Sequence, residues 1–160
     1  MIKDPGYRLN VGVIVVNHKG KLLLCKRKQS NNWQFPQGGI DSGEEPESAA
    51  YRELYEEVGI NKDSVKTLAI SKDWHKYDLP EASIQKSFFR NKFIGQKQKW
   101  FMFELIQKVE IDFTKDLNPE FDDYVWSSYW HPLQAIIGFK KEVYRDVLLE
   151  FCDPYIKRFV

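Results

Sequence analysis

The segment between Pro46 and Gly59 constrains the fold most strongly, because it specifies a helix with two different faces. Proline is favoured at the first position of a helix and glycine just after the last. We therefore expect a helix of about 13 residues, roughly 20 Å long at 1.5 Å per residue. Ala50, Leu54 and Val58 recur every four residues and form the apolar stripe that should face the core. Glu53 and Glu57 have the same spacing, but they lie about 100° around the helix axis from this stripe.

Three carboxylates, those of Glu53, Glu56 and Glu57, crowd one side of this helix. Like charges at positions i and i+4 repel and destabilise a helix by about 0.2–0.5 kcal/mol per pair. Two interpretations follow. The cluster binds a divalent cation such as Mg²⁺ or Mn²⁺, which prefers oxygen ligands. Alternatively, it is a solvated acidic face in which Arg52 pairs with Glu56 at i+4.

The other segments of the sequence alternate between strand-like and helix-like patterns. A hairpin is predicted around the turn "NHKG", and the stretch "WQFPQGGI" predicts a short extended segment before a glycine loop. Strands interleaved with two substantial helices predict an α/β fold with a mixed sheet covered on both faces. The length suits a single domain over residues 1–160. The predicted strands are 11–16, 22–25, 65–71, 99–106 and 124–130, and the further helices are a short one after Pro132 and an amphipathic one at 140–151.

The acidic helix belongs to a longer pattern that begins at the glycine loop. From Gly38 the sequence reads glycine, five residues, Glu44, seven residues, and then "RELYEEVGI" up to Ile60. This pattern resembles the signature box of the Nudix hydrolases at every fixed position. The resemblance implies an α/β/α sandwich in which a loop, a helix near 46–58 and a second loop form the box. It also implies hydrolysis of a nucleoside diphosphate linked to a further group, with two or three Mg²⁺ or Mn²⁺ ions.

The resemblance assigns roles to residues of the box. Glu53, Glu56 and Glu57 would hold the metal ions, joined by the carbonyl group of Gly38, and Arg52 would orient a catalytic glutamate through an ion pair. This agrees with the charge that spreads over phosphoryl oxygens during pyrophosphate cleavage, which metal ions stabilise.

Further stretches resemble the bacterial RNA 5′-pyrophosphohydrolases, which are also described as dinucleoside polyphosphate hydrolases. They are "GYRLNVGVIVVN", "WQFPQGGID", "IGQKQKWF" and "PEFDDYVWSSYWHPL…FKKEVYR". The implied activity removes pyrophosphate, or phosphates stepwise, from tri- or diphosphorylated RNA 5′ ends, leaves a monophosphate and so initiates mRNA decay. Two alternatives stay open: hydrolysis of dinucleoside polyphosphates such as diadenosine tetra- or pentaphosphate, and a catalytically silent module that binds nucleotides.

Positive charge and aromatic rings are interleaved between Ala82 and Phe103, a stretch without acidic residues. Such a composition suits phosphates and unstacked bases, although lysines also protect the edge strands of sheets. With the resemblance, Gln96, Lys97 and Lys99 become candidates for phosphate contacts. The other residues of this pattern are Lys86, Arg90, Lys92, Phe88, Phe89, Phe93, Trp100 and Phe101.

The remaining candidates lie outside the box. The resemblance implies that Glu120 in "NPEFDD" is a further metal ligand or catalytic carboxylate. It also implies that Phe139 stacks on a base whose other side contacts Arg27, an arrangement with a plausible energetic basis. The other residues that we assign to substrate binding are Arg8, Asn32, Gln37, Ile137 and Lys140.

Charge and cysteine usage indicate the cellular setting. The formal net charge is +1, so any binding of polyanions depends on local charge. Cys25 and Cys152 have no metal-ligand or disulfide spacing, which predicts buried or half-buried thiols in a reducing compartment. The polar start and the short apolar run "VGVIVV" favour a cytoplasmic protein with no membrane segment. No feature identifies a stimulatory protein partner.

Overall fold

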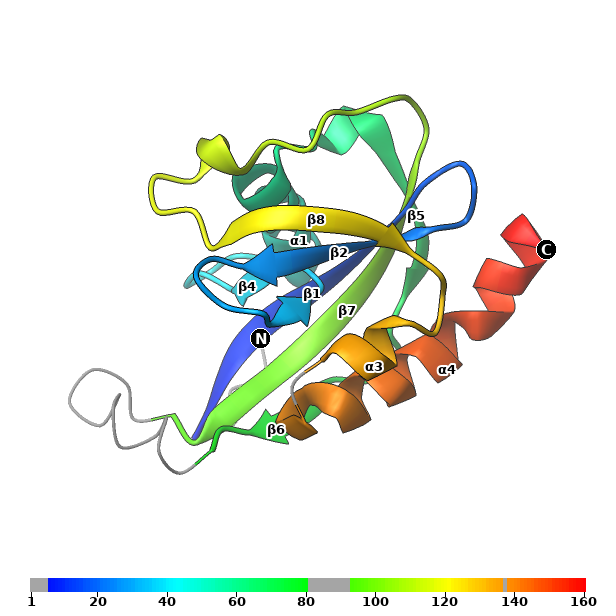
Figure 1. Cartoon of the computed structure of the whole chain (residues 1–160). Coiled ribbons are helices and arrows are strands. Elements are labelled where there is room, and N and C mark those ends of the chain that lie inside the picture. Colours follow the sequence, from blue (N-terminus) through cyan, green and yellow to red (C-terminus); the bar gives the residue numbers. More distant parts are fainter. Residues whose placement is uncertain (1–5, 81–92, 137) are drawn as a thin grey trace.

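The computed structural model describes residues 6–80, 93–136 and 138–160, and it contains a mixed sheet with helices on both sides (Figure 1). The strands are β1 (Tyr7–Val16), β2 (Leu22–Arg27), β3 (Trp33–Gln34), β4 (Gln37–Gly39), β5 (Val65–Ile70), β6 (His75–Asp78), β7 (Gly95–Leu105) and β8 (Phe121–Ser127). The helices are α1 (Pro46–Val58), α3 (Pro132–Ala135) and α4 (Lys141–Phe159), with short 3₁₀ turns η1 (Lys62–Ser64), η2 (Phe113–Lys115) and η3 (Gly138–Lys140).

The centre of the sheet is a parallel pair, β1 and β7, whose register runs from Tyr7↔Gly95 to Val16↔Glu104. The other pairings are antiparallel, which makes the sheet mixed. β1 meets β2 at Val16↔Leu22, but over Asn10–Gly12 its partner on that side is β4. The sheet therefore forks, and Figure 1 shows β2 and β8 diverging from β1 and β7 away from their common end.

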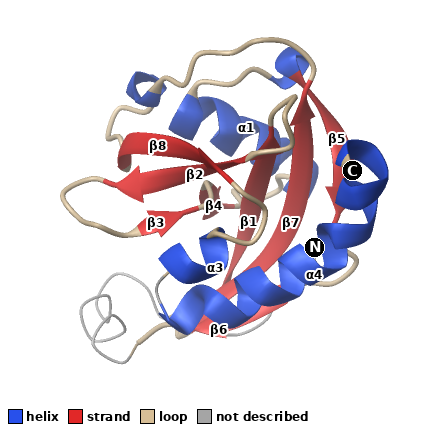
Figure 2. Cartoon of the chain, turned by 45° about the vertical axis from the view of Figure 1, so that its right-hand side comes forward, coloured by secondary structure: helices blue, strands red, loops and turns tan. Residues whose placement is uncertain are grey.

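Each face of the sheet has its own core. Val11 and Val13 point to the face that buries Ala50, Leu54 and Val58 of α1, the predicted stripe. Alternate residues of β1 point to the opposite face, where α3 and α4 pack (Figure 2). On that side the buried residues of α4 are Val143, Tyr144, Val147, Leu148 and Phe151.

Local signals predicted α1 correctly. The helix begins at Pro46 and ends at Val58, and Gly59 follows in the left-handed conformation with φ 73°. Its N–H donates to helix carbonyl groups, a termination that glycine permits without strain. The predicted hairpin is also confirmed, because the Asn17 side chain accepts hydrogen bonds from the N–H groups of Lys19 and Lys21 within the turn.

Several predicted elements have other bounds in the structure; for example, the strand predicted at 11–16 begins at Tyr7. The strand predicted at 124–130 runs instead over Phe121–Ser127, because Tyr129 turns inward and its hydroxyl donates to the carbonyl of Leu148 in α4. The helix predicted at 140–151 continues through Pro154 to Phe159. Tyr155 explains the continuation, since its hydroxyl donates to the carbonyl of Gly20 and anchors the last turns to the hairpin.

Other predictions stand with adjustments. Strand β7 begins at Gly95 rather than at 99, and β6 was not predicted at all. Cys25 is buried and Cys152 half-buried, as expected. Within the described ranges, no helix combines the length and apolar character that crossing a bilayer requires.

Candidate active site

A polar cavity of about 280 Å³ lies at the open end of the fork between β1 and β2. Strands, helix α1 and the segment before β8 all contribute to its wall. Residues far apart in sequence therefore face one space, and most of them were predicted as site residues. The lining consists of Arg8, Asn10, Arg27, Gln37, Gly38, Gly39, Glu53, Glu56, Glu57, Gln96, Asp116 and Glu120.

Strand β4 lies directly against the acidic face of α1. A Cβ atom on Gly38 would overlap the carboxyl group of Glu53, so only glycine allows this approach. The backbone N–H of Gln37 donates to Oε2 of Glu57 at 3.2 Å. The backbone of β4 and the two buried glutamates are therefore held in contact.

Arg52 joins the helix to the loop that precedes it. Its Nε and Nη2 donate to the two oxygens of Glu44, each at 2.9 Å, in a bidentate pair. Nη2 also donates to the carbonyl of Gly39 at 2.8 Å, and Nη1 reaches Glu53 at 2.7 Å and Glu56 at 3.2 Å. The sequence suggested two ion pairs for Arg52, one with Glu56 and one with a catalytic glutamate of the box. The structure contains a contact that corresponds to each of them.

The carboxylates of the cavity carry more negative charge than Arg52 offsets. Burial, together with the nearby charges of Glu56 and Glu120, raises the pKa of Glu53 to about 7 against the opposing effect of Arg52. Burial also raises the pKa of Glu57 well above its usual value, with Glu120 and Glu53 adding to the shift. By contrast, the hydrogen bond from Arg52 lowers the pKa of Glu44. Repulsion is therefore concentrated among Glu53, Glu57 and Glu120.

This donor set suits divalent cations chemically. Hard cations prefer carboxylate and carbonyl oxygens, and Glu53, Glu56, Glu57 and Glu120 line one cavity beside Gly38. In the part of the chain that the structure describes, no three His, Cys, Asp or Glu side chains converge on a single point. Instead, Glu53 and Glu56 both form ion pairs with Arg52.

Glu120 enters the cavity from the other branch of the fork. It directly precedes β8, and its carbonyl accepts a hydrogen bond from Lys28 N–H at 2.8 Å. The same strand pairing places Arg27 opposite Phe121. Asp116, four residues before Glu120, also lines the cavity and was not predicted. The acidic composition of "KDLNPE" was the only signal for it.

The base of the cavity continues into a group of aromatic and basic residues. The Tyr77 hydroxyl donates to Oε1 of Gln96 at 2.6 Å, and its ring lies 5.8 Å from that of Phe139. Lys140 is buried, with Nζ 3.3 Å from Oε1 of Gln34. Burial lowers the pKa of Lys140 to about 8 and raises that of Tyr77 to about 12. Tyr77 was missed because its strand, β6, was not predicted.

A buried amide network supports the cavity from below. Nε2 of Gln98 donates to Oδ1 of Asn10 at 2.8 Å and to Oε1 of Gln37 at 2.9 Å. Asn10 and Gln98 are opposite each other in the β1–β7 register. Neither was predicted as a site residue, because their proximity depends on pairing between distant strands.

Several predicted residues lie apart from this cavity. Lys97 and Lys99 point to the face of β7 opposite Gln96, and they do not line the cavity. Lys97 Nζ is 5.9 Å from the Trp74 ring, and Lys99 Nζ donates to the carbonyl of Lys72. Asn32 is exposed, and its carbonyl accepts from the N–H of Arg27.

The basic and aromatic pattern between Ala82 and Phe103 needs one correction. Trp100 and Phe101 are buried in the two cores, so they are not available to stack on bases. Ile137 lies outside the described residues, as do Lys86, Phe88, Phe89, Arg90 and Lys92.

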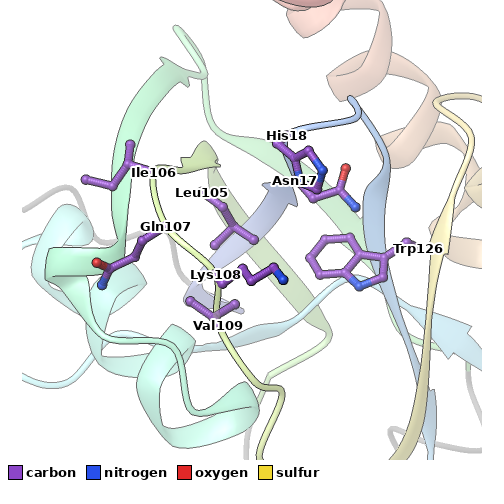
Figure 3. A pocket seen from close by; sticks show the side chains of 8 residues that line it. All are labelled: Asn17, His18, Leu105, Ile106, Gln107, Lys108, Val109 and Trp126. Atoms are coloured by element: carbon purple, nitrogen blue, oxygen red, sulfur yellow. The ribbon is translucent and has the colours of Figure 1, made fainter.

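A larger hollow, of about 400 Å³, lies near the other end of the sheet (Figure 3). It has no carboxylate in its lining and contains none of the predicted site residues. Its chemistry does not match that of the box. The lining residues are Asn17, His18, Leu105, Ile106, Gln107, Lys108, Val109 and Trp126.

Comparison with known proteins agrees with the box and the fold. The NUDIX domain model matches residues 6–151, and the chain belongs to the Nudix family. Within it, the chain is 46% identical to the RNA pyrophosphohydrolase of Yersinia pestis (strain Pestoides F) over 152 residues, which cover 94% of this chain and 86% of the relative. The same values hold for the RNA pyrophosphohydrolase of Yersinia pseudotuberculosis serotype O:1b (strain IP 31758). These relatives confirm the predicted resemblance to bacterial RNA pyrophosphohydrolases.

Solved structures share the fold at much lower identity. The dihydroneopterin triphosphate pyrophosphohydrolase of E. coli gives a TM-score of 0.71 at 16% identity, over 90% of this chain and 98% of that one. An Ap4A hydrolase of C. elegans, in a binary complex, gives 0.64 at 17% identity, over 91% and 98% of the two chains. These neighbours confirm the predicted Nudix α/β fold. That residues 1–160 form one domain stays a prediction.

Proposed function

We propose that this protein is a metal-dependent RNA pyrophosphohydrolase that converts tri- or diphosphorylated RNA 5′ ends into monophosphorylated ends. The observation that carries the proposal is the cavity in which four glutamates, Glu53, Glu56, Glu57 and Glu120, face Arg8, Arg27 and Gln96. The family and the 46% identity to proteins named RNA pyrophosphohydrolase support it. Removal of the phosphates would initiate mRNA decay, and the reaction would take place in the cytoplasm.

In this proposal each group of residues has a distinct role. The four glutamates and the Gly38 carbonyl hold two or three Mg²⁺ or Mn²⁺ ions. When bound, these ions neutralise the carboxylates and stabilise negative charge on the phosphoryl oxygens. Arg8 and Lys140 bind phosphates, one of the carboxylates accepts the proton of the attacking water, and Arg52 fixes Glu53.

The first nucleotides of the RNA would lie on the aromatic and basic group beside the cavity. Phe139 is half-buried beside Tyr77, and its ring would stack on a base. Arg27 projects from the end of β2 and would contact the other side of that base. Lys140, Gln37, Gln96 and the less closely placed Asn32, Lys97 and Lys99 are further predicted substrate contacts. Ile137, which lies outside the described residues, completes the predicted set.

Product analysis on 5′-triphosphorylated RNA with Mg²⁺ tests the proposal. We expect a monophosphorylated end and released pyrophosphate or phosphate, and no product from Glu57→Gln. Parallel reactions with diadenosine tetra- and pentaphosphate test the alternative substrate class, which would use the same cavity. Hydrolysis of dinucleotides with untouched RNA ends would contradict the proposal. Nucleotide binding without any turnover would instead indicate a silent module.

A further inference from the structure

Strand β4 positions backbone groups of the site, although the strand itself is short. It consists of three residues, Gln37–Gly39, and pairs only with β1 among the described strands. Yet it supplies the Gly38 backbone next to Glu53 and the Gln37 N–H that binds Glu57. A small shift of β4 would therefore change the distance between the glycine carbonyl and both buried carboxylates.

Gln98 provides a side-chain anchor for this strand from below. It is only 1% exposed and lies on β7, and it does not line the cavity. Both N–H bonds of its amide are used, toward Asn10 at 2.8 Å and toward Gln37 at 2.9 Å. A buried amide with two satisfied donors has a fixed orientation. The anchor therefore connects β4 to the central β1–β7 pair, the most extensive pairing in the sheet.

We propose that Gln98 is a positioning residue for the metal and phosphate site: it holds Gln37, and through it β4, against Glu53 and Glu57. This inference rests on the proposed function, because it takes the Gly38 carbonyl and the glutamates as cation ligands. Gln98 itself touches neither substrate nor cation. Partners that orient metal ligands from behind typically change metal affinity or activity by about 10- to 100-fold when they are replaced.

The test replaces Gln98 by methionine, which keeps the length and flexibility of the side chain but removes both donors. Met102→Leu is the matched control, since Met102 is also fully buried on β7 and points to the same face. Mn²⁺ binding is measured by the paramagnetic resonance signal of free Mn²⁺, without substrate. We expect Gln98→Met to raise the dissociation constant by about 10-fold or more and Met102→Leu to leave it unchanged.

A double-variant cycle separates positioning from general loss of structure. If Gln98 acts through Gln37, adding Gln37→Met to Gln98→Met should weaken Mn²⁺ binding little further, because coupled residues are not additive. Additive losses in the cycle, or unchanged Mn²⁺ binding in folded Gln98→Met, would overturn the proposal. Should Gln98→Met not fold, Gln98→Glu gives the same comparison, since a carboxyl group cannot donate to two acceptors.

The outcome is independent of substrate identity. If wild-type protein hydrolyses neither RNA ends nor dinucleotides, the proposed function fails, while the Mn²⁺ titrations still decide whether Gln98 positions the site. If RNA is hydrolysed, the Mn²⁺ concentration for half-maximal rate should rise in Gln98→Met in parallel with the dissociation constant. The KM for RNA at saturating Mn²⁺ should change less.

Discussion

Replacing Glu53 by glutamine should stabilise the protein without divalent ions and destabilise it relative to wild type when they are present. Glu53 is 8% exposed, and its pKa in the folded protein is about 7, against an ordinary value of 4.5. A carboxyl group with a raised pKa binds a proton more tightly in the folded than in the unfolded state. Its contribution to stability therefore becomes less favourable as the pH rises from 4.5 to about 7.

The magnitude follows from the difference between the pKa of Glu53 in the folded and in the unfolded protein. A tenfold change in proton affinity corresponds to about 1.4 kcal/mol, so ionisation of Glu53 costs roughly 1 kcal/mol at pH 5 and roughly 3 kcal/mol at pH 8. Glutamine keeps the shape and removes this cost, although it also loses the ion pair to Arg52. Arg52 retains its bidentate contact with Glu44. We therefore expect a gain in the free energy of unfolding that is larger at pH 8 than at pH 5.

Urea unfolding of wild type and Glu53→Gln in chelator, at pH 5 and pH 8, measures this gain. Mg²⁺ at about 1,000 times its dissociation constant should reverse the order, because a cation that binds only the folded state then stabilises it by about 4.1 kcal/mol, which exceeds the cost of the Glu53 charge. For the same reason, chelation should lower the melting temperature of wild type. Glu110→Gln, which changes an exposed carboxylate outside the cavity, is the control. A gain that is absent, or that does not depend on pH, would refute the reasoning.

Three further predictions use other contacts of the site. Arg52→Lys keeps the charge but loses the bidentate pair with Glu44 and the hydrogen bond to Gly39. Calorimetry should therefore show a free energy of unfolding lower by about 2 kcal/mol, and activity assays should show a large fall in kcat. An unchanged kcat would contradict this prediction. Lys140→Met should raise the free energy of unfolding by about 3 kcal/mol at pH 7 but only about 1 kcal/mol at pH 10. The reason is that burial lowers the pKa of Lys140 to about 8, so the cost of its charge is complete below pH 8 and disappears above 10.5; an equal gain at both values would refute this. Gly38→Ala should displace the Glu53 carboxyl and weaken Mn²⁺ binding in a titration, whereas Gly138→Ala, where a Cβ meets no atom within 4 Å, should bind Mn²⁺ as wild type does.

Local signals in the sequence predicted what depends on neighbours along the chain. Pro46 and Gly59 set the ends of α1, and the spacing of Glu53, Glu56 and Glu57 placed them on one side of it. The contacts of Arg52 also follow from short separations, since Glu44 and Glu56 lie within eight residues of it. In each case the geometry of one helix and one loop is sufficient to predict which side chains meet.

Sequence patterns failed where a contact depends on strand register. Gln98 and Asn10 are 88 residues apart, and Gln98 and Gln37 are 61 apart. Tyr77 meets Gln96 only because β6 pairs with β7, and the sequence around His75–Asp78 has no long apolar alternation. The lysines of β7 illustrate the same difficulty. A basic stretch predicts binding of phosphate, but strand alternation sends Gln96 to the cavity and Lys97 to the other face.

The location of the site follows from the way in which β2 and β4 share the edge of β1. β4 takes the position beside β1 that β2 would otherwise occupy, so the sheet opens and exposes strand ends that carry Arg8 and Arg27. Such an opening would be filled by apolar side chains if stability alone were selected. Instead, α1 turns buried carboxylates toward it, and their raised pKa values show that the folded protein without bound cations holds them at a cost. In the proposed function, that cost would raise the affinity of the site for cations, because each ion that neutralises the glutamates would recover it on binding.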